Sequence, residues 1–200
     1  MRARLPAARA GMTLVVEVAG PAHQDALAEL FRATQTPCFC RFWHFEGDKN
    51  AWLERCALAP EKNEAEMRDA LAHPALQGLV AHEADVAVGW MKLAARATLP
   101  KLRARPVYRS LDLGPDEGVL SIGCMLVRSE ARGRGVARAL VTSSIEIARA
   151  RGARAIEAYP HAASPLGPHE IWMGPADLFA SLGFRRIAGE IPYPVLRRDL

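Results

Sequence analysis

The chain lacks any apolar run long enough to cross a membrane, although half of its 200 residues are hydrophobic. It has only four cysteines, and no secretory signal peptide accompanies them, so the cysteine count does not indicate a disulfide framework. We therefore expect a cytoplasmic protein with reduced thiols and no membrane partner.

The chain also lacks a strong excess of charge. Lysine and arginine number 26 against 22 acidic residues, a formal net charge of +4, and the arginines are dispersed. We expect no nucleic-acid partner, although a basic nucleic-acid-binding protein stays open as an alternative that predicts steeply salt-dependent binding. No internal repeat is visible. Length and composition predict a single domain over residues 12–200, preceded by a flexible tail over residues 1–11.

What the sequence does contain is a strand, a glycine-rich turn and a helix in immediate succession. An apolar segment ends near Val127, and Gly133 and Gly135 lie in the turn. The apolar positions from Val136 to Ile147 then recur at helical spacing. The first turn of a helix offers unpaired N–H groups and the positive end of its dipole, and glycines let an anion approach the backbone. The order predicts a phosphate site.

Two common phosphate motifs are excluded. No Gly-Lys-Ser/Thr follows the turn, and Arg138 stands where the third glycine of a dinucleotide motif belongs. A disordered Arg-Gly tail is excluded as well, because the helix is periodic and Gly152 stands at its expected C-terminal end.

The run Arg132-x-x-Gly135-x-Ala137, placed after a strand containing Val127, resembles the acyl-CoA signature of the GNAT superfamily of N-acetyltransferases. Phe179-Ala-Ser-Leu-Gly-Phe184 resembles the C-terminal motif of the same proteins. The resemblance covers roughly residues 76–200 and is closest to an uncharacterised bacterial branch. It implies an α/β GNAT fold, with a mixed, mostly antiparallel sheet whose splayed central strands are flanked by helices.

The resemblance also implies a site and an activity. Loop amides would hold the CoA pyrophosphate, the preceding strand would pair with the pantetheine arm, and the Met125 N–H would polarise the thioester carbonyl. Acetyl-CoA would be the co-substrate, with no metal, and an unidentified primary amine would attack it directly in a ternary complex. The oligomeric state would be a monomer or a homodimer. The expected cofactor-binding residues are Met125, Leu126, Val127, Arg132, Gly133, Arg134, Gly135, Val136, Ala137 and Arg138.

The residues expected for acid–base catalysis depart from the superfamily's pattern. The superfamily's usual general acid is a tyrosine, but Phe179 occupies that position, and Trp172 replaces the usual asparagine. Tyr159 is the nearest alternative acid, with packing as its other interpretation. Glu117 is a candidate base, or else a solvated loop residue. Because the usual acid is missing, a non-catalytic acyl-CoA-binding or sensing module stays open as an alternative function.

Three further groups have competing interpretations. Cys124 has no neighbouring base in the sequence, so we expect a buried packing residue and not a nucleophile. Thiols and an imidazole within residues 38–56 could suit zinc, but their spacing is not that of a known zinc knuckle. We expect residues 38–45 to form a wall of the acceptor pocket, with Trp43 either there or in the core, and His161 and His169 to border that pocket.

The remaining elements follow from periodicity and turn residues. We expect helices to start at Pro21, at Asp48, at a capping box formed by Asn63, and after Gly135, with a further helix over residues 175–182. A loop is expected over residues 100–117. Strands are expected over residues 12–18, 78–83, 86–95, 155–159, 184–190 and 195–199, and in the segment that ends at residue 127.

Overall fold

The computed structural model describes residues 13–163, 165–167 and 170–200, so the expected tail over 1–11 lies outside the described residues. A seven-stranded sheet has the order β1-β2-β3-β4-β5-β7-β6, and only the β4–β5 pair is parallel. This confirms the predicted mixed, mostly antiparallel sheet; the division into domains stays a prediction. The strands are β1 (Leu14–Val18), β2 (Gly78–Glu83), β3 (Val86–Ala95), β4 (Val119–Val127), β5 (Ala155–Ala158), β6 (Arg185–Ala188) and β7 (Val195–Asp199).

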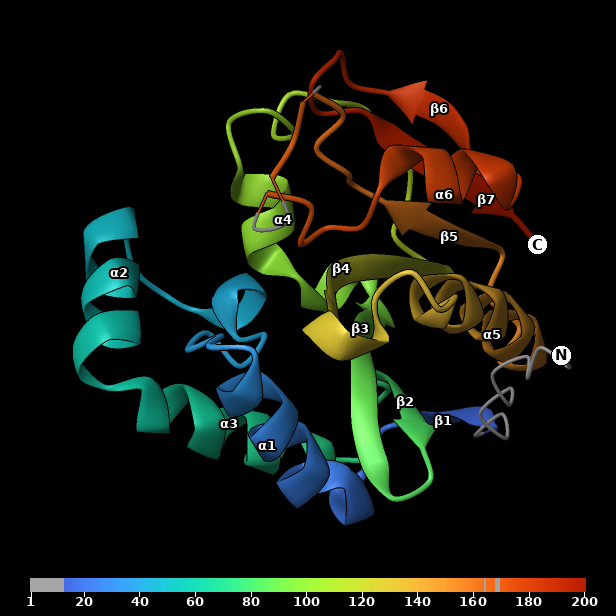
Figure 1. Cartoon of the computed structure of the whole chain (residues 1–200). Coiled ribbons are helices and arrows are strands. Elements are labelled where there is room, and N and C mark those ends of the chain that lie inside the picture. Colours follow the sequence, from blue (N-terminus) through green and yellow to red (C-terminus); the bar gives the residue numbers. More distant parts are fainter. Residues whose placement is uncertain (1–12, 164, 168–169) are drawn as a thin grey trace, which may run out of the picture.

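Helices cover both faces of this sheet (Figure 1). Trp90 and Met91 are neighbours on β3 and therefore point to opposite faces. Trp90 belongs to the buried cluster that contains residues of α1, whereas Met91 belongs to the cluster that contains residues of α5. No helix in the described part of the chain is both long and apolar enough to span a membrane. The helices are α1 (Gln24–Ala33), α2 (Lys49–Leu58), α3 (Pro60–Ala72), α4 (Pro100–Ala104), α5 (Val136–Ala150) and α6 (Ala176–Ser181).

The sheet opens between β4 and β5. These two strands pair from Val119 with Ala155 to Ile122 with Ala158, where β5 ends. The rest of β4 remains paired with β3 through Val127. Among the described residues, no strand pairs with the other edge of this outer half. The splayed central strands implied by the resemblance are therefore present.

A bulge marks the point where the strands part. Ile122 and Met125 of β4 face Leu93 and Met91 of β3, so two residues of β4 oppose Lys92 alone. One of the two is Gly123, where an added Cβ would lie 2.8 Å from Trp43 Nε1. Trp43 Nε1 donates a hydrogen bond of 2.9 Å to the Gly123 carbonyl, so this glycine is needed for the close approach of the indole.

A buried ionic network holds the inner half of β5. The Glu157 and Arg96 side chains are fully buried, and Arg96 Nη1 donates to Glu157 Oε1 over 2.9 Å. Arg197 of β7 donates to the same oxygen over 2.5 Å. Arg96 also donates to Asp116 over 2.6 Å and to the carbonyl of Pro115. One carboxylate thus joins β5, β7 and the loop that precedes β4.

The predicted start of α2 and the predicted end of α5 were confirmed, whereas the predicted start of α3 was wrong and α4 was not predicted. Asp48 caps α2, and Gly152 has a positive φ of 69° after α5, as expected. However, α3 begins at Pro60, and Asn63 lies buried inside it, donating to the Pro37 carbonyl over 3.0 Å. Helix α4 forms in the segment expected to be a loop, because Pro100 can start a helix and Leu99 and Leu102 are buried against the core.

We expect Glu157→Gln to lower the free energy of unfolding by about 3–5 kcal/mol, because it removes the buried carboxylate charge that Arg96 and Arg197 share and leaves Arg96 with Asp116 alone among the described residues. Chemical denaturation measures the change. Glu117→Gln is the matched control, since Glu117 is exposed and its replacement should change stability by no more than about 0.5 kcal/mol. A loss below about 1 kcal/mol at Glu157 would contradict the role given to the network.

Candidate functional site

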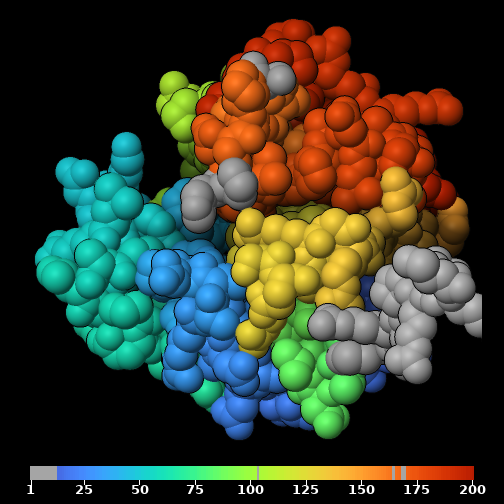
Figure 2. Space-filling model, in the orientation of Figure 1, coloured from blue at the N-terminus to red at the C-terminus, as the bar shows by residue number. Residues whose placement is uncertain are grey.

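The glycine-rich turn forms an anion-binding geometry. Gly133 and Gly135 have φ values of 72° and 86°, in the left-handed region that favours glycine, and α5 starts immediately afterwards. No side chain caps the helix N-terminus, and its first turn contains no acidic residue. Its amides and dipole are therefore available to an anion. The turn, coloured yellow, lies on the surface shown in Figure 2, between the blue-to-green and orange-to-red parts of the chain.

The arginines of the turn have different environments. Arg134 pairs with the largely buried Glu83 over 2.6 Å, so its charge is already neutralised. Arg132 donates to the Val127 carbonyl over 3.3 Å, and Arg138 donates to the Ser181 hydroxyl over 3.0 Å. Both retain a positive charge beside the turn. The charge available to a phosphate thus comes from these two residues and the helix N-terminus.

The open edge of β4 is occupied by another segment of the chain. The Met125 N–H, which we expected to meet the thioester carbonyl, donates over 2.7 Å to the carbonyl of Trp172. Leu126 and Val127, expected beside the pantetheine arm, continue this edge and are half-buried. A ligand can pair with the Met125 amide only after the Trp172 carbonyl moves away.

Tyr159 is not placed to give up a proton. Its ring is buried, and its hydroxyl donates to Glu157 Oε2 over 2.5 Å and lies 3.1 Å from the Ser121 hydroxyl. Burial, and next the charge of Glu157, raise the pKa of the Tyr159 hydroxyl well above its usual value. The geometry therefore gives Tyr159 a structural role in the Glu157 network and does not support its predicted role as general acid.

Phe179 fills the position of the superfamily's tyrosine with a buried ring. It packs against Phe184, with ring centroids 5.3 Å apart. A Cβ added at Gly174 would lie 2.8 Å from the Phe179 ring and 3.3 Å from the end of the Met125 side chain. The Phe179 ring and the end of the Met125 side chain thus both lie beside Gly174, but Phe179 offers no proton.

Glu117 lies at the opposite end of β4 from Met125. It is exposed just before Val119, whereas Met125 lies about 20 Å further along at roughly 3.3 Å per residue. Glu117 lines a surface hollow of about 280 Å³ together with Gly152, at the C-terminal end of α5. This hollow is remote from the turn, so the geometry does not support the predicted role of Glu117 as a base at Met125.

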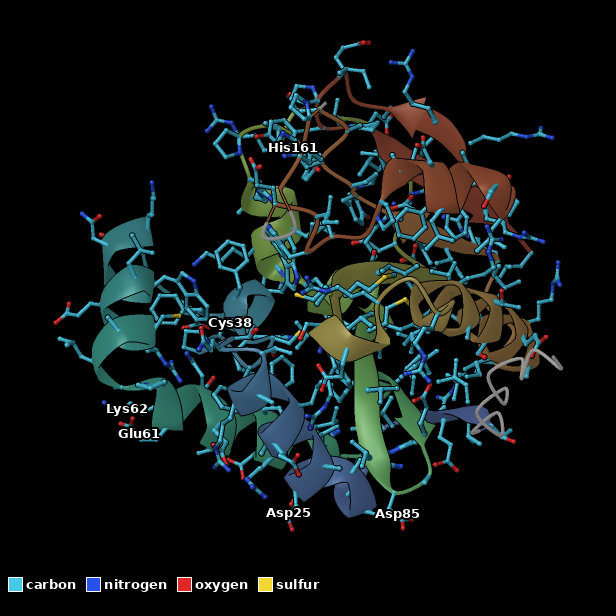
Figure 3. All side chains as sticks on the ribbon, viewed as in Figure 1. Asp25, Cys38, Glu61, Lys62, Asp85 and His161 are labelled. Atoms are coloured by element: carbon cyan, nitrogen blue, oxygen red, sulfur yellow. The ribbon has the colours of Figure 1, made fainter. Side chains whose placement is uncertain are left out.

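A second hollow, of about 210 Å³, lies beside the open edge. It is connected to Met125 through Trp172, whose carbonyl receives the Met125 N–H. His161, which Figure 3 labels, lines this hollow and stacks on Tyr193 with ring centroids 4.9 Å apart. That it borders the acceptor stays a prediction. His169 lies outside the described residues. The lining residues are Arg105, Tyr159, His161, Glu170, Trp172, Met173 and Tyr193.

The sequence did not lead us to expect Arg105 or Glu170 in this pocket, because both lie in segments that were predicted to be loops. Residues 38–45, which we expected to form a wall of the acceptor pocket, are not among the residues that line this hollow. Trp43 is fully buried and packs against Trp172 with ring centroids 5.7 Å apart, so it supports the wall from behind.

The thiols are placed for packing, not for catalysis. Cys40 and Cys124 are buried in one cluster, and Cys38, labelled in Figure 3, is half-buried. The hydrogen bond to Cys40, together with burial, raises the pKa of the Cys124 thiol. Burial lowers the pKa of the nearby Lys92 to about 8, and its amine donates to Gln77 over 2.9 Å. A thiol with a raised pKa is a poor nucleophile. That Cys124 carries no acyl group stays a prediction, with which its burial agrees.

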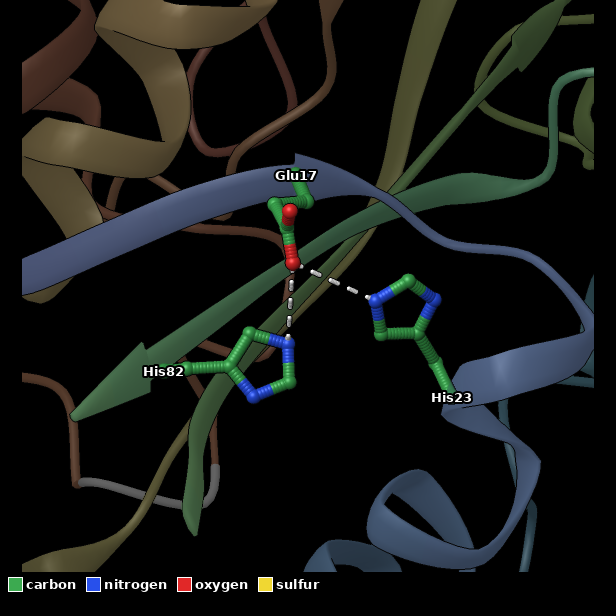
Figure 4. A group of neighbouring side chains, drawn as sticks. All are labelled: Glu17, His23 and His82. Atoms are coloured by element: carbon green, nitrogen blue, oxygen red, sulfur yellow. Dashed lines mark hydrogen bonds and ion pairs between the residues drawn. The ribbon is translucent and has the colours of Figure 1, made fainter. Parts of the chain in front are cut away.

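One group of potential metal ligands occurs in the described part of the chain, and it does not include the thiols: Glu17, His23 and His82 (Figure 4). Glu17 Oε2 lies 3.4 Å from His23 Nε2 and 3.9 Å from His82 Nε2. The Gly20 N–H donates to His23 Nδ1 over 3.1 Å, so neutral His23 carries its proton on Nε2, the atom that would have to bind a metal. The hydrogen bonds therefore favour a His23–Glu17 pair over metal ligation.

The model of the acetyltransferase (GNAT) family matches residues 48–165, more than half of the chain. The chain belongs to the GNAT acetyltransferase family. The match includes β4 and the turn with its glycines. No curated protein matches this chain, and the bacterial branch suggested by the sequence stays a prediction.

Solved acetyltransferases share the fold of this GNAT protein at low sequence identity. The PaiA N-acetyltransferase from Thermoplasma acidophilum, solved in complex with coenzyme A, superposes with a TM-score of 0.57 and 10% identity, covering 94% of this chain and 100% of the other. A GCN5-related N-acetyltransferase from Kribbella flavida gives 0.55 and 24%, covering 94% and 98%. The acetyltransferase YncA from Salmonella typhimurium, solved with acetyl-CoA, gives 0.51 and 18%, covering 94% of both chains. Family and fold together support acyl-CoA-dependent acetyl transfer in general.

We expect Gly135→Leu to weaken CoA binding at least tenfold, or about 1.4 kcal/mol, because a side chain would stand between the helix N-terminus and the phosphate. Calorimetry measures the affinity. Gly152→Leu is the matched control, since Gly152 also has a positive φ and open space around it. Both variants place a side chain at a backbone position with positive φ, so equal CoA affinities for the two would refute the assignment of the turn.

Proposed function

We propose that this GNAT protein transfers an acetyl group from acetyl-CoA to a primary amine by direct attack in a ternary complex. One observation carries the proposal: an uncapped helix N-terminus and the open edge of β4 meet beside a pocket of about 210 Å³. The first feature suits a pyrophosphate, the second an extended pantetheine arm, and the third a small acceptor.

The chain's own groups then have distinct roles. Amides of residues 133–138 bind the pyrophosphate, with Arg132 and Arg138 adding charge, and the edge at Leu126 and Val127 pairs with the pantetheine. The Met125 N–H, released from Trp172, donates to the thioester oxygen and stabilises the negative charge that develops there. The amine nitrogen bonds to the carbonyl carbon, and the carbon–sulfur bond breaks to release CoA as a thiolate.

Two protons must move in this reaction. The acceptor must lose one to become a neutral nucleophile, and His161 and Glu170 both line the pocket and can accept it. The thiolate gains one, and because an ordinary thiol has a pKa of about 8.5, solvent or the acetylated ammonium can supply it. A dedicated tyrosine acid is not required, which agrees with Phe179 at the usual position.

A second candidate function is acyl-CoA binding without turnover. Two observations favour it: Phe179 cannot donate a proton, and the Met125 N–H is already bonded to Trp172. An amine screen with acetyl-CoA, read out by thiol release, separates the two. Amine-dependent thiol release supports transfer, whereas tight acetyl-CoA binding with no release on a broad panel of amines supports the binding module.

We expect Tyr159→Phe to leave kcat within about threefold of the wild-type value and to lower the free energy of unfolding by about 1–3 kcal/mol. The variant leaves Glu157 with one hydrogen bond fewer but removes no proton donor from the reaction. Tyr108→Phe is the control, because the buried Tyr108 hydroxyl has no hydrogen-bond partner among the described residues. A tenfold loss of kcat at Tyr159 with unchanged stability would restore Tyr159 as the acid.

We expect acetyl-CoA binding to change the fluorescence of Trp172, because the carbonyl of this residue must leave the Met125 amide. The change should be largely absent in Trp172→Phe, which keeps the other three tryptophans. Hydrogen exchange at the Met125 amide provides the second readout and should stay protected once the thioester oxygen replaces Trp172. An identical fluorescence change in both proteins would show that the segment does not move.

A further inference from the structure

We propose that the acceptor is a small amine that also carries a carboxylate, and that Arg105 binds this carboxylate in the pocket of about 210 Å³. The inference rests on the proposed function and names the chemical class of its acceptor. It starts from Arg105, which lines the pocket and has no ion-pair partner among the described residues.

The surroundings of Arg105 hold its guanidinium without neutralising it. The guanidinium carbon lies 6.0 Å from the centroid of the Trp43 ring and 5.7 Å from that of Tyr108. Arg96 and Arg197, in contrast, both form ion pairs with the Glu157 carboxylate. Aromatic contacts position the guanidinium plane, and its N–H groups can then form two parallel hydrogen bonds with one carboxylate. An arginine held in this way is suited to a planar anion.

The same pocket presents a carboxylate of its own. Glu170 Oε2 accepts a hydrogen bond of 2.8 Å from the Gly167 N–H, and no ion pair joins Glu170 to Arg105. A cation and an anion that share a small hollow without pairing complement a molecule with both charges. A phosphate dianion fits less well, because Arg105 is the single arginine or lysine among the described residues that line the pocket, and Glu170 would repel the second charge.

The pocket is also connected to the reacting atoms. Trp172 forms part of its wall and contacts Met125 through its carbonyl. Trp43, which packs against Arg105, donates to the Gly123 carbonyl at the bulge of β4. Arg105 and the Met125 amide are therefore both held relative to the bulge. At about 210 Å³ the hollow is smaller than the roughly 300–1,000 Å³ of drug-sized ligand sites, so it suits a small acceptor.

The test compares amines that share one carbon skeleton: an amino acid, its amide, and the amine without the carboxylate. We expect the wild-type protein to favour the amino acid in kcat/KM by about tenfold to a hundredfold, the usual effect of a hydrogen-bonded charge. Arg105→Gln should raise the KM of the amino acid by the same factor and abolish the preference, with the KM of acetyl-CoA unchanged. Arg105→Lys should fall between the two.

The control variant is Arg109→Gln, which removes an exposed arginine from the same segment and should leave all KM values unchanged. An aminophosphonate of the same skeleton tests the anion, and its preference over the amino acid would overturn the assignment to a carboxylate. Acetylation of all three amines with equal kcat/KM, or an unaffected Arg105→Gln, would overturn the inference while the proposed function stands. Acetyl-CoA binding with no amine acetylated would overturn both.

Discussion

The early end of β5 is the constraint on which the site depends. Glu157 lies one residue before the end of this strand and is held between Arg96 and Arg197. The Tyr159 hydroxyl bonds to the same carboxylate just after the strand. This network holds the chain at the point where it leaves the sheet after Ala158, and beyond that point the outer half of β4 has an open edge. Breaking the network would therefore disturb both the opening and the pocket that Tyr159 helps to line.

The site consists of two parts with different physical origins. The anion-binding turn is local: two left-handed glycines and an uncapped helix supply its donors, and it needs little beyond the order of residues 127–138. The pocket depends on tertiary structure, because its lining comes from the residue after α4, the end of β5 and the segment around Trp172. The hydrogen bond between the Met125 N–H and the Trp172 carbonyl lies where the two parts meet, so in the proposed function acetyl-CoA would displace a residue that lines the pocket.

This difference in origin explains what the sequence could predict. The turn and α5 follow from periodicity and glycine positions, which are local signals. The sheet with its splayed central strands was predicted from the resemblance to the GNAT superfamily. No local pattern marks the Glu157 network, the contact of the Trp172 carbonyl with Met125, or the lack of an ion-pair partner for Arg105 among the described residues. Each depends on segments far apart in the sequence. Asn63 illustrates the same limit: its spacing from Glu66 resembles a capping box, but its partner is the Pro37 carbonyl, and the helix starts earlier.

The central claim is that acetyl-CoA lies in the opening between β4 and β5. A crystal structure of the acetyl-CoA complex tests it most directly. We expect pyrophosphate oxygens within hydrogen-bond distance of main-chain amides of residues 133–138. The thioester oxygen should accept a hydrogen bond from the Met125 N–H, and the Trp172 carbonyl should be displaced from that N–H. A complex in which the Met125–Trp172 hydrogen bond persists, or in which CoA binds elsewhere on the chain, would contradict the account.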